Sequence, residues 1–478
     1  MFKPEIVPSI STKKLIYDKI KQETNDCIQG LTTHGIPNLF RTNHTSARFM
    51  WMFLTFGSAC VTAIFLTQTI LEFLQFNVST EVRLIDADEM ELPIITICNK
   101  NKLSTNFSID FMNKIIEKHS SKSEIIKREY FDLDTKNSVR FELKYDPAKF
   151  IFAEIPFELR ESMTKSIQDM LIECKFDMKP CNASDFEYIF NAKYGNCYRF
   201  NSKRDRYVKK ANSQFGLILN LYLGQPSELD NLGLEKGIYV STDAHNVNPF
   251  LDFEDVMEVS TNMETNILLE RQLFLKYPKP YSNCDFDNKL KKDDLFTSEY
   301  YKLVLASKYS YSRSICLHFC RSLKISQILG CKFRSSSIEI PNINYCTQFN
   351  SSDLYDTQDE VVNMNSDVKL EQNIYDNVSK YCHEQCPLEC ERIKYSNYVS
   401  SNEYPDILVD LMKSQIVKKN VFVYETNETK RLENDLVRLK VYYGSMSYIQ
   451  YKESQIMSIY GLISNLGGSL GLFLGKMN

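Results

Sequence analysis

Cysteine is the residue type whose spacing in this sequence most clearly predicts chemistry. Twelve of the fourteen cysteines lie between two uncharged stretches of the chain. Cys316 and Cys320 are four residues apart, and Cys382, Cys386 and Cys390 repeat that interval. Thiols that lie close together oxidise to disulfides in extracellular compartments. The spacing therefore predicts a disulfide framework in an oxidising environment.

Zinc binding is the alternative use of these thiols. Structural zinc sites favour cysteine pairs separated by two residues, which the four-residue interval does not match. The nearby His383 does not complete a ligand set. We therefore expect no metal site and no cofactor. Cys27 and Cys60 precede the framework and are expected to stay reduced, the first in the cytosol and the second in the membrane.

Helical geometry limits how the cysteines pair. Residues at i and i+4 share a helix face, so Cys316 and Cys320 project from one face of a helix predicted over 311–329. The row that begins at Cys382 meets this face in parallel or in antiparallel order, and the spacing leaves both open. Two further pairs are close enough in sequence to close short loops: Cys174 with Cys181, and Cys331 with Cys346.

Two uncharged stretches flank this framework and must position it. The first runs from Phe49 to Leu71. As a helix it spans roughly 34 Å, enough for a hydrocarbon core of about 30 Å. We predict a transmembrane helix over 49–73. The second stretch is uncharged as far as Gly475 but rich in Ser, Gly and Asn, which suits a helix over 454–478 that faces protein or water inside an oligomer.

The N-terminal region gives the orientation. Residues 1–48 carry seven Lys/Arg against four acidic residues and are too polar for a signal peptide. The positive-inside rule places this region in the cytosol and 74–453 outside a plasma membrane. The expected glycosylation sites all fall in that extracellular region: Asn106, Asn182, Asn350, Asn377 and Asn427.

Composition and local patterns narrow the fold and function. The net charge of −4 excludes a generally basic nucleic-acid binder. Residues 91–98, 215–223 and 237–240 have the pattern of strands, whereas 109–127 and 406–418 have helical spacing. These segments predict an α+β membrane protein with a β core and peripheral helices. The sequence has no nucleophile elbow, zinc-type histidine pair or phosphate loop, so we expect no enzyme.

Five motifs in order carry a family resemblance. They are THGI at 33–36, PIITICN at 93–99, YGNCYRFN at 194–201, YPKPYSNC at 277–284 and GGSLGLFLG at 467–475. Together the motifs resemble the degenerin/epithelial sodium channel superfamily, which includes acid-sensing and peptide-gated channels. The resemblance runs from His34 to Gly475. It implies a homo- or heterotrimer of subunits with two transmembrane helices and a hand-like extracellular domain. It also implies sodium conduction, block by amiloride, and opening by protons, peptides or mechanical load.

The resemblance also implies how the cysteines pair. It selects the antiparallel order for the two rows. The implied pairs are Cys98–Cys197, Cys174–Cys181, Cys284–Cys390, Cys316–Cys386, Cys320–Cys382 and Cys331–Cys346.

The same resemblance assigns roles in gating. His34 and Gly35 resemble the cytosolic gating motif, and Tyr281 resembles the aromatic residue that couples the extracellular domain to the membrane, with Phe76 as its partner. His245 matches the family pattern too, but we interpret it as structural. Acid-sensing members carry a histidine pair beside this point, where this chain has Asn77 and Val78. We therefore expect a peptide or mechanical stimulus rather than protons.

The second uncharged stretch contains the implied pore. Glycines four residues apart let helix backbones approach closely, as a narrow pore between three helices requires. A tight helix pair without a pore is the other use of this spacing. Ser464 resembles the small residue near the gate of these channels, where a larger side chain holds the pore open. The implied pore residues are Asn465, Gly467, Gly468, Gly471 and Gly475.

The end of the sequence departs from the family pattern. The family follows its last glycine with x-Ser and further membrane residues, whereas Lys476 follows Gly475 here. We therefore expect a shortened second helix. The alternative function is a non-conducting regulatory or ligand-binding subunit of such a channel.

Overall fold

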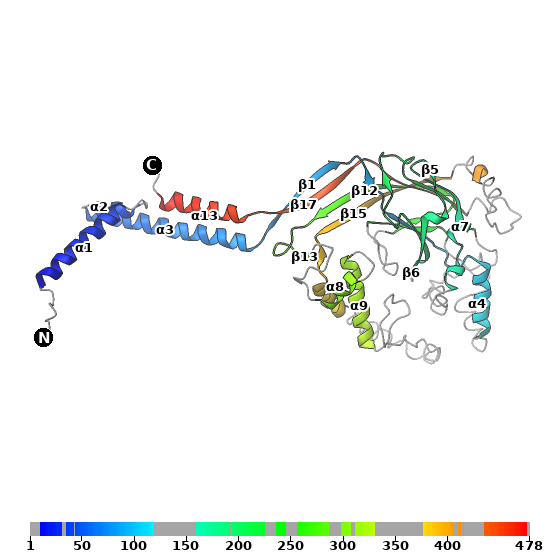
Figure 1. Ribbon diagram of the computed structural model, residues 1–478, viewed down its shortest axis with the longest axis horizontal. Helices are drawn as coiled ribbons and strands as arrows, with labels where there is room; N and C mark the ends of the chain where they lie inside the picture. Colours follow the sequence, from blue (N-terminus) through cyan, green and yellow to red (C-terminus); the bar gives the residue numbers. More distant parts are fainter. Residues whose placement is uncertain are drawn as a thin grey trace, which may run out of the picture. The chain divides into compact units, whose positions relative to one another are not determined.

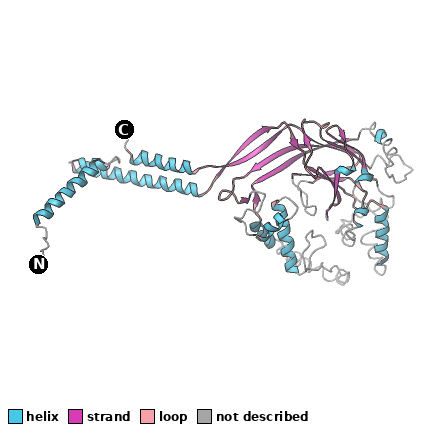
Figure 2. Cartoon of the chain, viewed as in Figure 1, coloured by secondary structure: helices cyan, strands magenta, loops and turns pink. Residues whose placement is uncertain are grey.

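The computed structural model is shown in Figure 1. It describes residues 10–30, 35–42, 44–118, 159–191, 194–224, 236–244, 256–285, 298–306, 311–329, 376–404, 409–412, 414 and 435–475. The chain divides into two units. The helical unit comprises Met1–Thr80, Lys279–Ser282 and Glu453–Asn478, and the disulfide-rich unit comprises Glu81–Pro278 and Asn283–Lys452. In Figure 2 the strands are concentrated in the disulfide-rich unit.

Four helices form most of the helical unit: α1 (Ile10–Gly30), α2 (Ile36–Arg41), α3 (Thr45–Leu74) and α13 (Ile459–Leu474). Among the described residues α3 alone is long and apolar enough to cross a membrane, and α13 is a shorter apolar helix. Large apolar side chains on α3 face outward, including Phe53, which is 74% exposed. This is the exposure expected of a helix surrounded by lipid rather than by its own chain.

The helices at the two predicted membrane segments differ in extent from those segments. The first begins at Thr45, before the predicted residue 49. The second begins at Ile459 rather than 454, because β17 (Ser447–Gln455) continues through the first residues of the uncharged stretch. The Ser458 hydroxyl then caps the helix by accepting a hydrogen bond from Gly461 N at 3.0 Å. The lack of charged residues thus locates the uncharged stretch in the sequence, but it does not show at which residue the helix begins.

The larger sheet of the disulfide-rich unit has eight strands. Its order is β1 (Val78–Asp86), β17, β12 (Met263–Leu275), β16 (Leu436–Tyr443), β9 (Leu217–Tyr222), β4 (Leu171–Phe176) and β5 (Lys179–Pro180), with β15 (Glu391–Glu403) also pairing with β12. The long strand β12 pairs in parallel with β16 over its first half and with β17 over its second. Strand β12 therefore joins the part of the sheet that contains β1 and β17 to the part that contains β16, β9, β4 and β5.

The second sheet has five antiparallel strands. Their order is β11 (Met257–Val259), β10 (Ile238–Asp243), β3 (Ile94–Asn99), β7 (Gly195–Phe200) and β6 (Phe186–Asn191). All six residues of β3 are buried, as are all six of β7. Two short pairs, β2 (Met90–Glu91) with β8 (Tyr207–Val208) and β13 (Cys284–Asp285) with β14 (Leu388–Glu389), complete the strands.

A hydrophobic core joins the two sheets. Ile97 of β3 and Phe200 of β7 belong to the same buried cluster as Leu219 of β9 and Leu439 of β16. Strands therefore form at each of the three segments where the sequence pattern predicted them, and they form the predicted β core. The predicted mixture of helices and strands is therefore confirmed for the disulfide-rich unit.

Short and long helices lie outside the sheets. They are α4 (Asn106–Lys118), η3 (Glu161–Met163), α7 (Ile167–Met170), η4 (Ala183–Asp185), α8 (Glu299–Ala306), α9 (Arg313–Leu329) and the helical residues 376–385. Helix α4 begins at Asn106, before the predicted residue 109. Of the predicted helix at 406–418, residues 409–412 and 414 are described and helical.

Five disulfides connect these elements. They are Cys98–Cys197, Cys174–Cys181, Cys284–Cys390, Cys316–Cys386 and Cys320–Cys382. The last two join α9 to 376–386 in antiparallel order. Cys331 and Cys346 lie outside the described residues. Cys27 and Cys60 are free and exposed. In the described part of the chain, no group of His, Cys, Asp and Glu side chains is placed to hold a metal ion.

Candidate functional site: the packed helices and the aromatic pocket

Helix α13 packs against α3 within the helical unit (Figure 1). The Ser58 hydroxyl donates a 2.7 Å hydrogen bond to the Phe473 carbonyl, a backbone acceptor in the last turn of α13. About two turns further along α3, the Phe65 ring stacks on the Phe473 ring with 5.6 Å between centroids. A small polar contact and an aromatic pair thus hold the C-terminal end of α13 against the middle of α3.

The glycines of α13 do not make this contact. A Cβ atom added at Gly467, Gly468 or Gly471 would meet no atom within 4 Å. Ser464 and Asn465, in the preceding turn, are exposed. The glycine backbone is therefore open to close approach by a surface outside this chain, whereas α3 packs on other residues of α13.

Gly35 is the described half of the predicted cytosolic gating motif, since His34 lies outside the described residues. Gly35 has φ +87°, a left-handed conformation that is costly for residues with a Cβ. A Cβ at this position would also overlap the Thr55 hydroxyl of α3. Two features of this position therefore require glycine. One is the backbone angle, and the other is that the turn preceding α2 lies very close to α3.

Phe76 and Tyr281 meet where α3 ends. Their rings contact edge to face, with 5.4 Å between centroids and an interplanar angle of 82°. The Tyr281 hydroxyl donates a 2.7 Å hydrogen bond to Gln455 Oε1. Ile456 N donates to the Asn77 carbonyl at 3.1 Å. The segment that leaves α3, the segment around Tyr281 and the segment that leads into α13 are thus tied together by one aromatic contact and two hydrogen bonds.

A cavity of about 240 Å³ adjoins this aromatic contact. Its lining residues are Glu72, Phe73, Gln75, Phe76, Asn77, Tyr281, Ile456 and Met457. The Asn77 amide donates to Gln75 Oε1 at 2.9 Å, so two of the polar side chains at the cavity bond to each other. We call this cavity the aromatic pocket.

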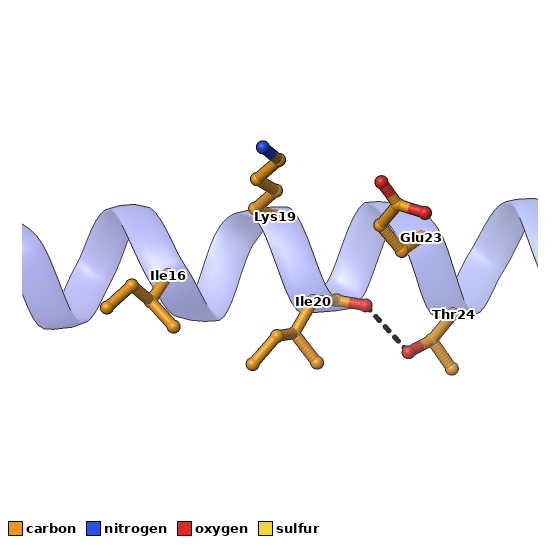
Figure 3. Close-up of a pocket in the computed structure, with 5 residues that line it drawn as sticks. All are labelled: Ile16, Lys19, Ile20, Glu23 and Thr24. Carbon is orange, nitrogen blue, oxygen red and sulfur yellow. Dashed lines mark hydrogen bonds between the residues drawn. The ribbon is translucent and has the colours of Figure 1, made fainter.

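A second concavity lies on α1 and is lined by that helix alone. Figure 3 shows Ile16 and Ile20 on one side of the helix and Lys19 and Glu23 on another. The Thr24 hydroxyl donates to the Ile20 carbonyl at 2.6 Å, which is an ordinary intrahelical contact. Since no other element lines it, this concavity is an amphipathic helix surface, and we assign no site to it.

Among the described residues of the disulfide-rich unit, Lys165 is a strongly perturbed cation. Lys165 is 3% exposed, and its ammonium lies 4.2 Å from the centroid of the Tyr222 ring. Burial lowers the pKa of Lys165 to about 8, although the carboxylates of Asp169 and Asp435 partly oppose the shift. Sequence reasoning missed this residue, because nothing in its neighbours in the chain predicts burial of a lysine.

The remaining predicted residues are dispersed. Asn106, Asn182 and Asn377 are exposed, as glycosylation requires. Asn350, Asn427 and His245 lie outside the described residues. Sequence reasoning missed three polar residues of these contacts. Thr55 lies where a Cβ on Gly35 would be. Ser58 donates to the Phe473 carbonyl, and Gln455 accepts from the Tyr281 hydroxyl. These are common polar residues with no motif around them, so only the folded contacts identify them.

Comparison with known proteins defines the class. The family profile described as "Amiloride-sensitive sodium channel" matches residues 28–476. The chain therefore belongs to this family, within the degenerin/epithelial sodium channel superfamily, whose members are ion channels and not enzymes.

Individual relatives cover the chain to different extents. Epithelial sodium channel subunit gamma of Rattus norvegicus is 28% identical over 68% of this chain and 47% of its own length. Acid-sensing ion channel 1 of Gallus gallus is 24% identical over 93% of this chain and 79% of its own. The human bile acid-sensitive ion channel is 22% identical over 95% of this chain and 83% of its own. The chain thus spans about half the length of the gamma subunits that it matches.

Proposed function

We propose that this chain is a pore-forming subunit of a sodium-selective, amiloride-sensitive cation channel that assembles as a trimer in the plasma membrane. Helix α3 crosses the membrane, the shorter α13 lies in the membrane against α3, residues before α3 are cytosolic, and the disulfide-rich unit is extracellular. The observation that carries the proposal is the open glycine face of α13, together with membership of the family.

The open glycine face supports the assembly. Gly467 and Gly471 are four residues apart on a helix whose contact with α3 uses other residues. Small residues at this spacing let helices pack closely in lipid. Since the described part of this chain does not cover them, copies of α13 from other subunits are the natural partners, and a narrow pore lies between those copies. Ser464 and Asn465 then lie within one turn before Gly467 and Gly468.

One feature supports a stimulus other than protons. Asn77, at the place of the acid-sensing histidine pair, carries no titratable side chain, and its carbonyl accepts a hydrogen bond from Ile456 N. We propose an extracellular peptide or mechanical load as the stimulus.

Cysteine modification near the gate tests the proposal. The full chain with Cys60→Ser, which removes the exposed thiol of α3, serves as the background for Ser464→Cys. We expect an amiloride-sensitive sodium current that an extracellular, positively charged methanethiosulfonate reagent raises and holds, because added bulk at residue 464 keeps the pore open. Ile463→Cys is the matched control, since it is the adjacent exposed residue on α13 and is not expected to lock the pore open.

The outcomes separate the two functions. No current from correctly trafficked protein, alone or with a related subunit, would contradict the pore-forming role. No current alone but an altered current in a co-expressed relative would favour the regulatory subunit instead. An equal response at residues 463 and 464 would show that the reagent acts without reference to a gate.

A further inference from the structure

The aromatic pocket has the composition of a cation-binding site. Phe73, Phe76 and Tyr281 place three aromatic rings around one cavity, and Glu72 adds a carboxylate. None of the described residues that line the cavity is a Lys or an Arg. The rings of Phe73 and Phe76 are 6.1 Å apart between centroids, and those of Phe76 and Tyr281 are 5.4 Å apart. Aromatic faces attract cations through the ring quadrupole, and quaternary ammonium groups are bound in such aromatic cages.

The polar contacts of the pocket leave its aromatic surface and one carboxylate for a cation. The Tyr281 hydroxyl donates to Gln455, and the Asn77 amide donates to Gln75, so these two donors point at protein acceptors. The pocket also presents the Met457 side chain and the Glu72 carboxylate, which has no ion-pair partner within the described chain. A methylated ammonium binds through contact and charge, which aromatic rings and a carboxylate supply without hydrogen bonds.

Size and position agree with this ligand class. A cavity of about 240 Å³ is several times the volume of roughly 30 Å³ that one water takes up in the liquid. Glu72 is the first charged residue after the uncharged run of α3. If α3 crosses the membrane as proposed, Glu72 lies at the level of the lipid headgroups, where a quaternary ammonium arrives either on phosphatidylcholine or as a soluble compound.

We infer that the aromatic pocket binds a quaternary ammonium group, which contacts the rings of Phe73, Phe76 and Tyr281 and is paired with the Glu72 carboxylate. This binding does not require that the chain conducts ions. The inference rests on the proposed function only for the position of the pocket relative to the membrane.

Equilibrium binding of radiolabelled choline to the purified full chain tests the inference. In nanodiscs of phosphatidylglycerol, which has no choline, we expect saturable binding. Unlabelled tetramethylammonium should compete. The neutral analogue 3,3-dimethylbutan-1-ol, which replaces the nitrogen of choline by carbon, should compete about tenfold less well or worse. Equal competition by the neutral analogue would overturn the inference, because the pocket would then be merely apolar.

Two variants assign the binding to this pocket. Glu72→Gln keeps the shape and removes the charge, and Phe73→Leu removes one ring without removing an apolar surface. Each should weaken choline binding about threefold to thirtyfold. The matched controls Glu89→Gln and Phe53→Leu change an exposed carboxylate and an exposed ring outside the pocket. Equal effects in the variants and their controls, or none in the variants, would overturn the assignment.

The lipid composition identifies the source of the ligand. If phosphatidylcholine nanodiscs abolish labelled choline binding, a lipid headgroup occupies the pocket. If binding is the same in both lipids, the pocket takes a soluble quaternary ammonium compound. Two negative results together would overturn the inference for both sources. The first is no saturable choline binding in phosphatidylglycerol nanodiscs. The second is no enrichment of choline lipids around the wild-type protein relative to Glu72→Gln.

Discussion

The two units of this chain bury their side chains in opposite ways. In the disulfide-rich unit β3 and β7 are buried along their whole length, and five disulfides connect the elements. In the helical unit Thr62 is the buried residue of α3, and Tyr460 of α13 is 81% exposed. One unit satisfies its apolar surface within the chain, whereas the other presents that surface outward.

This difference indicates what specifies each unit. The disulfide-rich unit has a core of its own and constrains the unfolded chain covalently. The helical unit relies on a few particular contacts, such as Gly35 against Thr55 and Phe76 against Tyr281, and on whatever covers its outer faces. Substitutions in the first unit should therefore act mainly on stability. Substitutions in the second should act through single contacts and, under the proposed function, on channel opening.

The largest effect is expected from removing a disulfide that joins two helices. Cys320→Ser with Cys382→Ser opens a buried pair that closes 62 residues of sequence. We expect a loss of about 2–5 kcal/mol in the free energy of unfolding, measured by denaturant titration of the purified protein. The matched control is Cys60→Ser, which removes a free, exposed thiol from α3 and should change little. Similar losses in the two variants would contradict the contrast between the units.

The pH dependence of stability should reveal the buried Lys165. Its pKa is about 8 in the folded protein and near 10.5 when the chain is unfolded. Between these values the unfolded state binds more protons, so the free energy of unfolding rises with pH. Below pH 8 the lysine is charged in both states and the cost of its burial is fully present. We expect a rise of up to about 2 kcal/mol between pH 8 and 10.

The comparison variant for this rise is Lys165→Met. Denaturant titrations at several pH values should show the rise in the wild type and its absence in the variant. The neighbouring Tyr198, whose hydroxyl donates to the Lys165 carbonyl, does not add to this rise, because burial raises its pKa well above the ordinary tyrosine value. Parallel pH profiles for the two proteins would contradict burial of the charged lysine.

Gly35→Ala should have the largest effect of a single contact in the helical unit. The left-handed backbone costs alanine about 1–2 kcal/mol, and the new methyl group overlaps the Thr55 hydroxyl. We expect a lower thermal midpoint and, under the proposed function, a smaller amiloride-sensitive current.

A double-mutant cycle separates the two causes. Thr55→Ala removes the overlapping hydroxyl but not the backbone strain, so Gly35→Ala should cost less on that background than in the wild type. The single variant Thr55→Ala controls for the lost hydrogen bond to the Trp51 carbonyl. Strictly additive effects would show that the close approach of Gly35 to α3 contributes nothing.

The sequence predicted local features well and long-range ones poorly. Cysteines spaced four apart predicted the faces of α9 and 376–386 that meet, because helix periodicity fixes which side chains share a face. Strands at 94–99 and 217–222 followed from local patterns. The parallel pairing of β12 with both β16 and β17 did not, since it joins segments more than 150 residues apart and no local pattern encodes it. Helix α1 was also missed, because its mixed charge hid a weak amphipathic pattern. Absence of charge could not locate the start of α13, because the end of β17 is uncharged too.

The smallest expected effect concerns the aromatic contact at the end of α3. Phe76→Leu removes the edge-to-face contact with Tyr281, which is worth about 0.5–1.5 kcal/mol beyond burial. Tyr281→Phe keeps the ring and removes the hydrogen bond to Gln455, worth about 0.5–1.5 kcal/mol. Under the proposed function each variant should shift the stimulus that half-opens the channel by severalfold and leave sodium selectivity unchanged, because neither residue lines the implied pore.

Tyr281→Leu removes both interactions, so on that background Phe76→Leu should have almost no further effect. An undiminished effect of Phe76→Leu on that background would mean that Phe76 acts on another neighbour, such as Phe73, and that the contact with Tyr281 does not couple the segments that it joins.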